Sequence, residues 1–190
     1  MLLLNAGFET ALALFRASRM AAEPVIFPTD TIYGIGAPIS SVAANKKIYD
    51  IKARSMDKPL PLLVGSLDGL YPIVGKLRPD VEKWLSTLWP GRYTVIFKAA
   101  SELDPFYSLN GTVAVRMVSL DWLAKAIDCL GEPITATSIN RSGYPPLQGQ
   151  GEIYTDYSKI CKFMLAGTSG TQSSMIIDIS GGEPKTIRDI

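Results

Sequence analysis

The stretch Pro28-Thr29-Asp30-Thr31-Ile32-Tyr33-Gly34-Ile35-Gly36 directly follows a short apolar segment, Val25-Ile26-Phe27. Valine, isoleucine and phenylalanine favour strands, and an unbroken apolar run is typical of a strand buried on both faces. In open α/β sheets, ligands bind outside the carboxyl ends of such strands. The stretch therefore predicts an α/β fold with a ligand site immediately after this strand.

The segments around this stretch alternate between helical and strand patterns. Ser40 or Ser41 can cap a helix in which Ala44, Ile48 and Ile51 form an apolar stripe. Several of the later strands follow one another with no helix between them, so the sequence predicts a mixed rather than a purely parallel sheet. The other expected helices are Phe8–Met20, Val81–Leu88 and Ser119–Leu130, and the other expected strands are Leu60–Val64, Tyr93–Phe97, Thr112–Met117, Ile134–Thr137 and Met175–Ile179.

The bulk properties exclude several classes of protein. The chain has 190 residues, 47% of them hydrophobic, which suits a single domain over residues 1–190. A formal net charge of +1 gives no overall attraction for nucleic acid. With no histidine, and two cysteines at no metal-ligand spacing, nucleophile systems and metal sites built on histidine are excluded. No run reaches the ~18 apolar residues of a membrane span, so we expect a cytoplasmic protein without membrane contact.

Two groups of side chains near the loop suit small polar and anionic ligands. Thr29, Thr31 and Tyr33 place three hydroxyls on alternate residues, and in an extended segment these would point the same way. Lys52, Arg54 and Lys58 follow at a predicted helix end, where they fit either phosphate and carboxylate binding or a solvated basic helix terminus.

Further candidates follow later strands. Ser138 and Asn140 come after the strand ending near Thr137, and they fit either nucleotide contacts or an ordinary turn. Arg116 lies within an apolar strand, where it faces either solvent or a cleft that binds an anion. Ser174 and Arg188 are weaker candidates near the end of the chain. The sequence contains neither a P-loop nor a GxGxxG motif.

Taken in order, PTDTIYGIG, KARSMDKP, VAVR, TSINRSG and SSMIID with a late Ile-Arg resemble the YrdC-like family of threonylcarbamoyl-adenylate synthases. The resemblance covers nearly the whole chain and implies a twisted open mixed sheet with helices packed on it and a basic concave cleft. Two departures are Met117-Val118 after Arg116 and Asp189-Ile190 after Arg188, where the family often has proline.

The resemblance implies a nucleotidyltransferase that condenses L-threonine, bicarbonate and ATP to threonylcarbamoyl-AMP, with Mg²⁺ carried by the ATP phosphates. A threonylcarbamoyl transferase would pass the product to tRNA, and a direct tRNA contact is one implied partner. By motif, Lys52 and Arg54 would be catalytic. Threonine and bicarbonate would bind at Thr29, Thr31, Tyr33 and Arg116, and the nucleotide at Lys58, Ser138, Asn140, Ser174 and Arg188.

Three other interpretations remain open from the sequence. The first is an RNA-binding module that uses the basic cleft, although Tyr49 is the only aromatic residue near Lys52–Lys58 on which a base could stack. The second is a relative that makes carbamoyl-adenylate, which is expected within a larger multidomain chain. The third is a paralogue that has the same fold and a different small substrate.

Overall fold

The computed structural model describes residues 1–189, and it has the expected mixed α/β fold, with the strands divided between two sheets. We call them sheet A, with strand order β1-β9-β2-β3-β8, and sheet B, with strand order β11-β10-β5-β6-β4-β7. Sheet A consists of β1 (Leu2–Asn5), β2 (Val25–Phe27), β3 (Gly34–Gly36), β8 (Thr137–Ser138) and β9 (Phe163–Ala166). Sheet B consists of β4 (Leu62–Val64), β5 (Tyr93–Lys98), β6 (Thr112–Met117), β7 (Ile134–Thr135), β10 (Met175–Asp178) and β11 (Lys185–Arg188).

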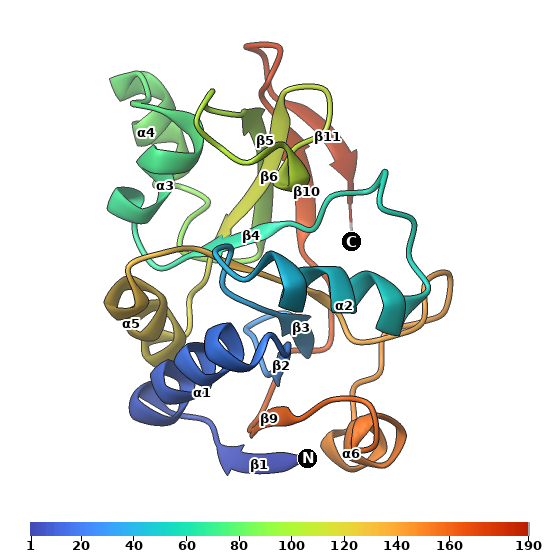
Figure 1. Ribbon diagram of the computed structural model, residues 1–190. Helices are drawn as coiled ribbons and strands as arrows, with labels where there is room; N and C mark the ends of the chain where they lie inside the picture. Colours follow the sequence, from blue (N-terminus) through green and yellow to red (C-terminus); the bar gives the residue numbers. More distant parts are fainter. Residues whose placement is uncertain (190) are drawn as a thin grey trace.

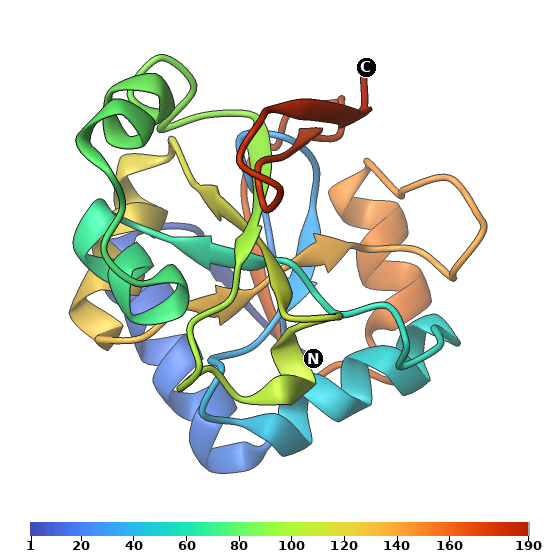
Figure 2. The same cartoon turned by 90° about the horizontal axis from the view of Figure 1, so that it is seen from above.

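Helices surround the two sheets, as Figures 1 and 2 show. The pair α1 and α5 joins both sheets through one apolar cluster that includes Phe15, Phe27 and Leu63. Helices α3 and α4 cover sheet B, whereas α2 and α6 contribute to the cluster on sheet A. The helices are α1 (Phe8–Ala21), α2 (Val42–Lys52), α3 (Leu67–Val74), α4 (Pro79–Leu85), α5 (Asp121–Leu130) and α6 (Gln150–Tyr157), with a 3₁₀ turn at Pro105–Tyr107. None of the helices within residues 1–189 is both long and apolar enough to cross a membrane.

The two sheets meet where the chain leaves β7 and enters β8. The single strand expected over Ile134–Thr137 is wrong, because Ala136 separates two short strands, β7 in sheet B and β8 in sheet A. Gly36 lies against this junction, where a β-carbon would come within 1.8 Å of the Thr135 carbonyl oxygen. Only glycine allows the two backbones to approach this closely.

A buried polar network holds the same junction. Asn45 in α2 donates to the Pro38 carbonyl oxygen at 2.9 Å and to the Tyr107 hydroxyl at 3.1 Å. Its own amide oxygen accepts from the Thr135 hydroxyl, which in turn accepts from the Ala37 amide. Because buried polar groups are costly when unpaired, this network fixes how the two sheets meet and therefore the shape of the space between them.

A buried carboxylate ties α1, α2 and β9 together. Glu23 receives Lys47 at 2.8 Å and Lys162 at 2.9 Å, and its side chain is 9% exposed. Burial raises the pKa of Glu23, but hydrogen bonds and charge from the two lysines outweigh burial, and the pKa ends below its usual value of 4.5.

We expect Glu23→Gln to lower the free energy of unfolding by about 1 kcal/mol at pH 7, since both lysines are partly exposed. The folded pKa lies below the unfolded one, so this contribution is present above about pH 4.5 and disappears as the pH falls through the folded pKa. Urea unfolding of both proteins at pH 7 and pH 3 measures it. A difference that persists undiminished at pH 3 would contradict the ion-pair explanation.

Candidate functional site

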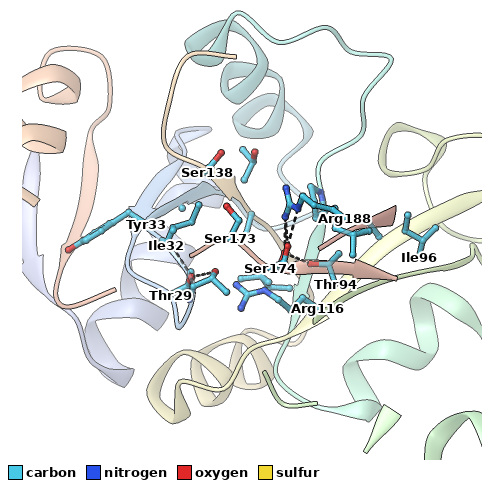
Figure 3. Close-up of a pocket in the computed structure, with 18 of the residues that line it drawn as sticks. Thr29, Ile32, Tyr33, Thr94, Ile96, Arg116, Ser138, Ser173, Ser174 and Arg188 are labelled. Atoms are coloured by element: carbon cyan, nitrogen blue, oxygen red, sulfur yellow. Dashed lines mark hydrogen bonds between the residues drawn. The ribbon is translucent and has the colours of Figure 1, made fainter. Parts of the chain in front are cut away.

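A pocket of about 270 Å³ lies between the two sheets, in the region that carries most of the predicted site residues. Its walls come from the loop after β2, from β3 and β8 of sheet A, and from β4, β5, β6, β10 and β11 of sheet B. Figure 3 shows the side chains from the two sheets converging on this space. The predicted residues that line it are Thr29, Thr31, Tyr33, Arg54, Arg116, Ser138, Ser174 and Arg188.

The two threonines of the opening stretch form a buried hydroxyl pair. Their Oγ1 atoms lie 2.8 Å apart, and Thr29 also donates to the Ile32 carbonyl oxygen at 2.7 Å. The Thr31 amide donates to Thr29 Oγ1, so the hydroxyl of Thr29 is used within the loop itself. The hydroxyl of Thr31 has no other partner among the described residues, and an acceptor position on its oxygen remains for a ligand.

The hydroxyl of Tyr33 does not join this pair. The loop bends rather than running extended, and the phenol reaches away from the other labelled side chains (Figure 3). Its hydroxyl donates to the Gly167 carbonyl oxygen at 2.6 Å and accepts from the Gly167 amide at 3.0 Å. The expectation that three hydroxyls point the same way is therefore wrong for Tyr33.

We expect Tyr33→Phe to cost about 1–3 kcal/mol of stability, because it leaves both polar groups of Gly167 without their partner in a partly buried position. The affinity for an amino acid in the pocket should change by less than about threefold, since the hydroxyl faces elsewhere. Thermal unfolding and calorimetric titration measure the two effects. A large loss of affinity with unchanged stability would return Tyr33 to the list of ligand contacts.

Arg116 lies in the pocket wall, in a buried ion pair. Its Nη1 donates to Asp30 Oδ1 at 2.7 Å, and the two side chains are only 6% and 8% exposed. Arg116 therefore takes the inward of the two orientations left open by the sequence. In sheet B, β6 lies between β5 and β4, and the side chain of Arg116 reaches from β6 to Asp30 in the loop after β2.

Lys52 lies outside the pocket lining, behind the turn that follows β8. Its Nζ donates to the Ser138 carbonyl oxygen, to the Asn140 carbonyl oxygen at 2.9 Å and to Asn140 Oδ1 at 2.7 Å. Burial, and secondarily the charge of Arg54, lower the pKa of Lys52 to about 8, while its three oxygen acceptors favour the ammonium form. Lys52 thus holds the turn that presents Ser138 to the pocket.

Asn140 is likewise used within its own turn. Oδ1 accepts from Lys52 and from the Ser138 hydroxyl at 2.6 Å, and Nδ2 donates to the carbonyl oxygens of Arg141 and Tyr144. Its amide therefore organises the turn and does not line the pocket. Its predicted contact with the nucleotide stays a prediction.

The helix end separates the three cations that the sequence grouped together. After Lys52 the chain turns through Ala53 in a left-handed conformation with φ 47°, and Arg54 then returns to the pocket wall. Arg54 Nε donates to the Lys58 carbonyl oxygen at 3.0 Å, whereas the side chain of Lys58 is exposed and lies outside the pocket lining.

Arg188 completes the pocket from β11. Its guanidinium donates to the Ser174 carbonyl oxygen at 3.0 Å through Nε and to the Ser174 hydroxyl at 3.3 Å, and that hydroxyl also bonds Thr94 at 2.8 Å. Arg54, Arg116 and Arg188 thus bring three guanidiniums to one pocket. The wider basic cleft expected around this pocket stays a prediction.

Sequence reasoning missed several pocket residues. Thr94, Thr137 and Ser173 line the pocket, and Asp30 pairs with Arg116. The two threonines lie in or beside predicted strands and gave no separate signal. Asp30 did give one, because a carboxylate in a hydroxyl loop and an arginine in an apolar strand each need a buried partner of opposite charge.

The comparisons with known proteins agree with this fold. The Sua5/YciO/YrdC family model, described as "Telomere recombination", matches residues 20–189. A threonylcarbamoyl-AMP synthase of Vibrio parahaemolyticus is 30% identical over 152 residues, which cover 78% of this chain and 82% of that protein.

Two solved structures superimpose on nearly the whole chain. Pyrococcus abyssi Sua5 complexed with L-threonine has a TM-score of 0.88 and 25% identity, and covers 99% of this chain. The chain spans only 57% of that solved protein. The structure of E. coli YciO has a TM-score of 0.84 and 21% identity, covers 99% of this chain and 93% of its own, and supports the fold alone. On the family match and the agreement in fold, the chain belongs to the Sua5/YciO/YrdC family.

Proposed function

We propose that the chain is an L-threonylcarbamoyladenylate synthase, which condenses L-threonine, bicarbonate and ATP to threonylcarbamoyl-AMP and pyrophosphate. The observation that carries the proposal is the pocket between the two sheets, which is lined by the hydroxyl pair of Thr29 and Thr31 and by three arginine residues. Its chemistry suits a hydroxy amino acid together with phosphate and bicarbonate anions. Support comes from the curated relatives, which are named threonylcarbamoyl-AMP synthases, and from Sua5, which was solved with L-threonine.

The reaction suits a chain that has no histidine. The threonine amine and bicarbonate give a carbamate and release water. One carbamate oxygen then attacks the α-phosphate of ATP while pyrophosphate leaves. No protein nucleophile is required, so catalysis consists of positioning the reactants and stabilising their negative charge. Repulsion between the carbamate and the triphosphate is the main obstacle, and fixed cations reduce it.

The pocket residues divide naturally between the substrates. Thr31 belongs to the loop after β2, and Arg116 is bonded to Asp30 of the same loop. We assign both Thr31 and Arg116 to the binding of the substrate threonine. Arg54, Ser138, Ser174 and Arg188 line the rest of the pocket, and we assign them to bicarbonate and the nucleotide phosphates. Lys52 and Asn140 act from behind by holding Ser138 in place.

The Mg²⁺ ion would arrive on the ATP phosphates. Within residues 1–189 no group of three or more cysteine, aspartate or glutamate side chains is placed to hold a metal ion. Magnesium is commonly bound through substrate phosphates and water with few protein ligands, and we propose that mode of binding here. Its chemistry when bound would be neutralisation of charge on the triphosphate.

The product determines the partners. Threonylcarbamoyl-AMP is a mixed anhydride that transfers its acyl group readily, so a transferase acting on tRNA is the partner that we infer for the cytoplasmic protein. A direct contact of this chain with tRNA remains part of the proposal. If the chain were only an RNA-binding module, threonine and bicarbonate would not stimulate the release of pyrophosphate from ATP.

Pyrophosphate release tests the proposed function. With ATP and Mg²⁺ we expect release to require both L-threonine and bicarbonate, and we expect valine and serine each to support it at least about tenfold more slowly. Valine lacks the hydroxyl and serine the methyl, so together they test both ends of the side chain. Release that proceeds without bicarbonate, or equally with valine, would favour a paralogue with another substrate.

A further inference from the structure

A second pocket, of about 560 Å³, lies on the other face of sheet B from the candidate site. Phe97 of β5 lines it, whereas the neighbouring Ile96 lines the candidate site, and successive side chains of a strand point to opposite faces of a sheet. Among the described residues, the two pockets have no lining residue in common. Pockets for small molecules usually hold about 300–1,000 Å³, so this one is large enough for a ligand of its own.

The floor of the second pocket is apolar. Val81 and Trp84 of α4 belong with Phe97 and Ile179 to one hydrophobic cluster, and all four residues line the pocket. Phe97 is buried, whereas Trp84 is only partly buried. An indole ring that keeps part of its surface exposed in a pocket gives a flat apolar group a surface on which to pack.

The rim of the same pocket is cationic. Three basic residues and two carboxylates line it, and Arg78 forms an ion pair with Asp80. Lys76 and Lys98 therefore outnumber the remaining carboxylate, Glu183. Within residues 1–189, neither lysine has an ion pair or a hydrogen bond through its side chain, so both ammonium groups are available to a ligand.

One backbone hydrogen bond brings together the segments that carry these two lysines. The Ala100 amide, which follows Lys98 closely, donates at 2.8 Å to the carbonyl oxygen of Ile73 near the end of α3. Lys76 comes directly after that helix, and both lysine side chains are exposed. The anionic group of a ligand that packs against Trp84 can therefore accept a charge-assisted hydrogen bond from either lysine.

The β10–β11 hairpin lines both pockets, one at each of its ends. At its closed end, Ile179 and Pro184 line the second pocket. At its open end, Ser174 and Arg188 line the candidate site, where Arg188 Nε donates to the Ser174 carbonyl oxygen at 3.0 Å. Strand β11 is the edge strand of sheet B and is exposed along its whole length. The position of Arg188 therefore depends on how firmly this hairpin is held.

We propose that the second pocket binds an organic anion with a flat apolar body, and that this ligand steadies Arg188 in the candidate site through the hairpin. The apolar part packs against Trp84 and Phe97, and the anionic group binds Lys76 and Lys98. By filling the space beside the turn of the hairpin, the ligand restricts its motion, and the restriction extends to Arg188 at the other end. The occupant of this pocket regulates the candidate site and takes no part in the proposed reaction.

The first test uses 8-anilinonaphthalene-1-sulfonate, an aromatic sulfonate whose fluorescence rises in apolar surroundings. Wild-type protein should bind it saturably. Lys76→Glu combined with Lys98→Glu should weaken binding at least about tenfold, because two attractive contacts become repulsive. Lys83→Glu combined with Lys125→Glu is the matched control, since it makes the same change in net charge at exposed positions outside the pocket lining. The control should alter the affinity by less than about twofold, because salt screens distant exposed charges.

A neutral probe tests which part of the ligand the lysines contact. N-phenyl-1-naphthylamine has the same rings without the sulfonate. Its affinity should change by less than about threefold in the Lys76→Glu, Lys98→Glu variant, because the apolar floor remains intact. Retained binding of the neutral probe also shows that the pocket is still folded in this variant.

Amide hydrogen exchange measures the link between the two pockets. With the sulfonate at saturation, exchange in the wild type should slow at least about threefold along β11 as well as in the turn that precedes it. The Lys76→Glu, Lys98→Glu variant should show no slowing at the same concentration of the sulfonate. Neither the affinities nor the exchange rates require a nucleotide.

Four results would overturn the inference. Equal weakening by the two double variants, or equal weakening of both probes, would show that the lysines do not bind the anionic group. Slowed exchange confined to the turn would remove the link to Arg188. Displacement of the sulfonate by ATP and Mg²⁺ would place the probe in the candidate site. Protein that binds the sulfonate as expected but has no affinity for ATP would instead overturn the proposed function and leave the second site standing.

Discussion

Replacing Arg116 by alanine is expected to lower the free energy of unfolding by about 3–5 kcal/mol, because it leaves the Asp30 carboxylate buried without its counter-ion. Threonine binding should be lost at the same time, since the pocket loses the guanidinium assigned to the carboxylate. Urea unfolding and calorimetric titration measure the two effects separately. Arg16→Ala is the matched control, because Arg16 is exposed on α1, and its removal should change stability by less than about 0.5 kcal/mol.

A double-mutant cycle separates the ion pair from recognition. Asp30→Ala combined with Arg116→Ala should cost much less stability than the sum of the single changes, because no unpaired charge remains in the interior. The double variant should still fail to bind threonine. Additive losses of stability would mean that the two side chains do not depend on each other, in contradiction to the 2.7 Å contact.

The fold class followed from local sequence patterns, whereas the division into two sheets did not. Val25–Phe27 and Thr112–Met117 read as strands because their residue types and apolar runs match buried strands. The change of sheet at Ala136 has no comparable signature, since it depends on the close approach of Gly36 to Thr135 across about a hundred residues of chain. Strands β1 and β11 and helices α3 and α6 were also missed, since all four are short and α3 contains Pro72.

Most of the candidate site could be predicted because its residues lie in or next to strands that line the space between the two sheets. Thr29, Thr31, Arg116 and Ser138 meet in the pocket as the order of motifs implied. The direction of each side chain could not be predicted, because it depends on backbone angles in the connecting turns. Tyr33 turns to Gly167, and Lys52 points behind the pocket. Sequence order therefore located the site, and the turns determined which atoms face it.

The same distinction gives Lys52 a sharper role than that of a cation among phosphates. Its ammonium is the donor that holds three oxygens of the Ser138–Asn140 turn, and it is only 2% exposed. Lys52→Met preserves length and removes every donor, so the turn that presents Ser138 shifts, and we expect turnover to fall about 100-fold, as for a misplacement of about 1 Å at a reacting centre. Stability should fall as well, because buried acceptors are left unpaired.

The pH dependence tests whether the ammonium itself is required. The pKa of Lys52 is lowered to about 8 from its usual 10.5, so wild-type turnover should decline as pH rises through 8. Between pH 8 and 10.5 the unfolded chain still binds a proton that the folded chain has released, so the contribution of Lys52 to stability rises over the same range. Activity that falls while this stability term rises cannot come from unfolding. Lys52→Met should lose both the fall in turnover and the rise in stability above pH 8. Lys46→Met, at an exposed position of the same helix, is the matched control and should keep both. A wild-type pH profile in Lys52→Met would disprove the assignment.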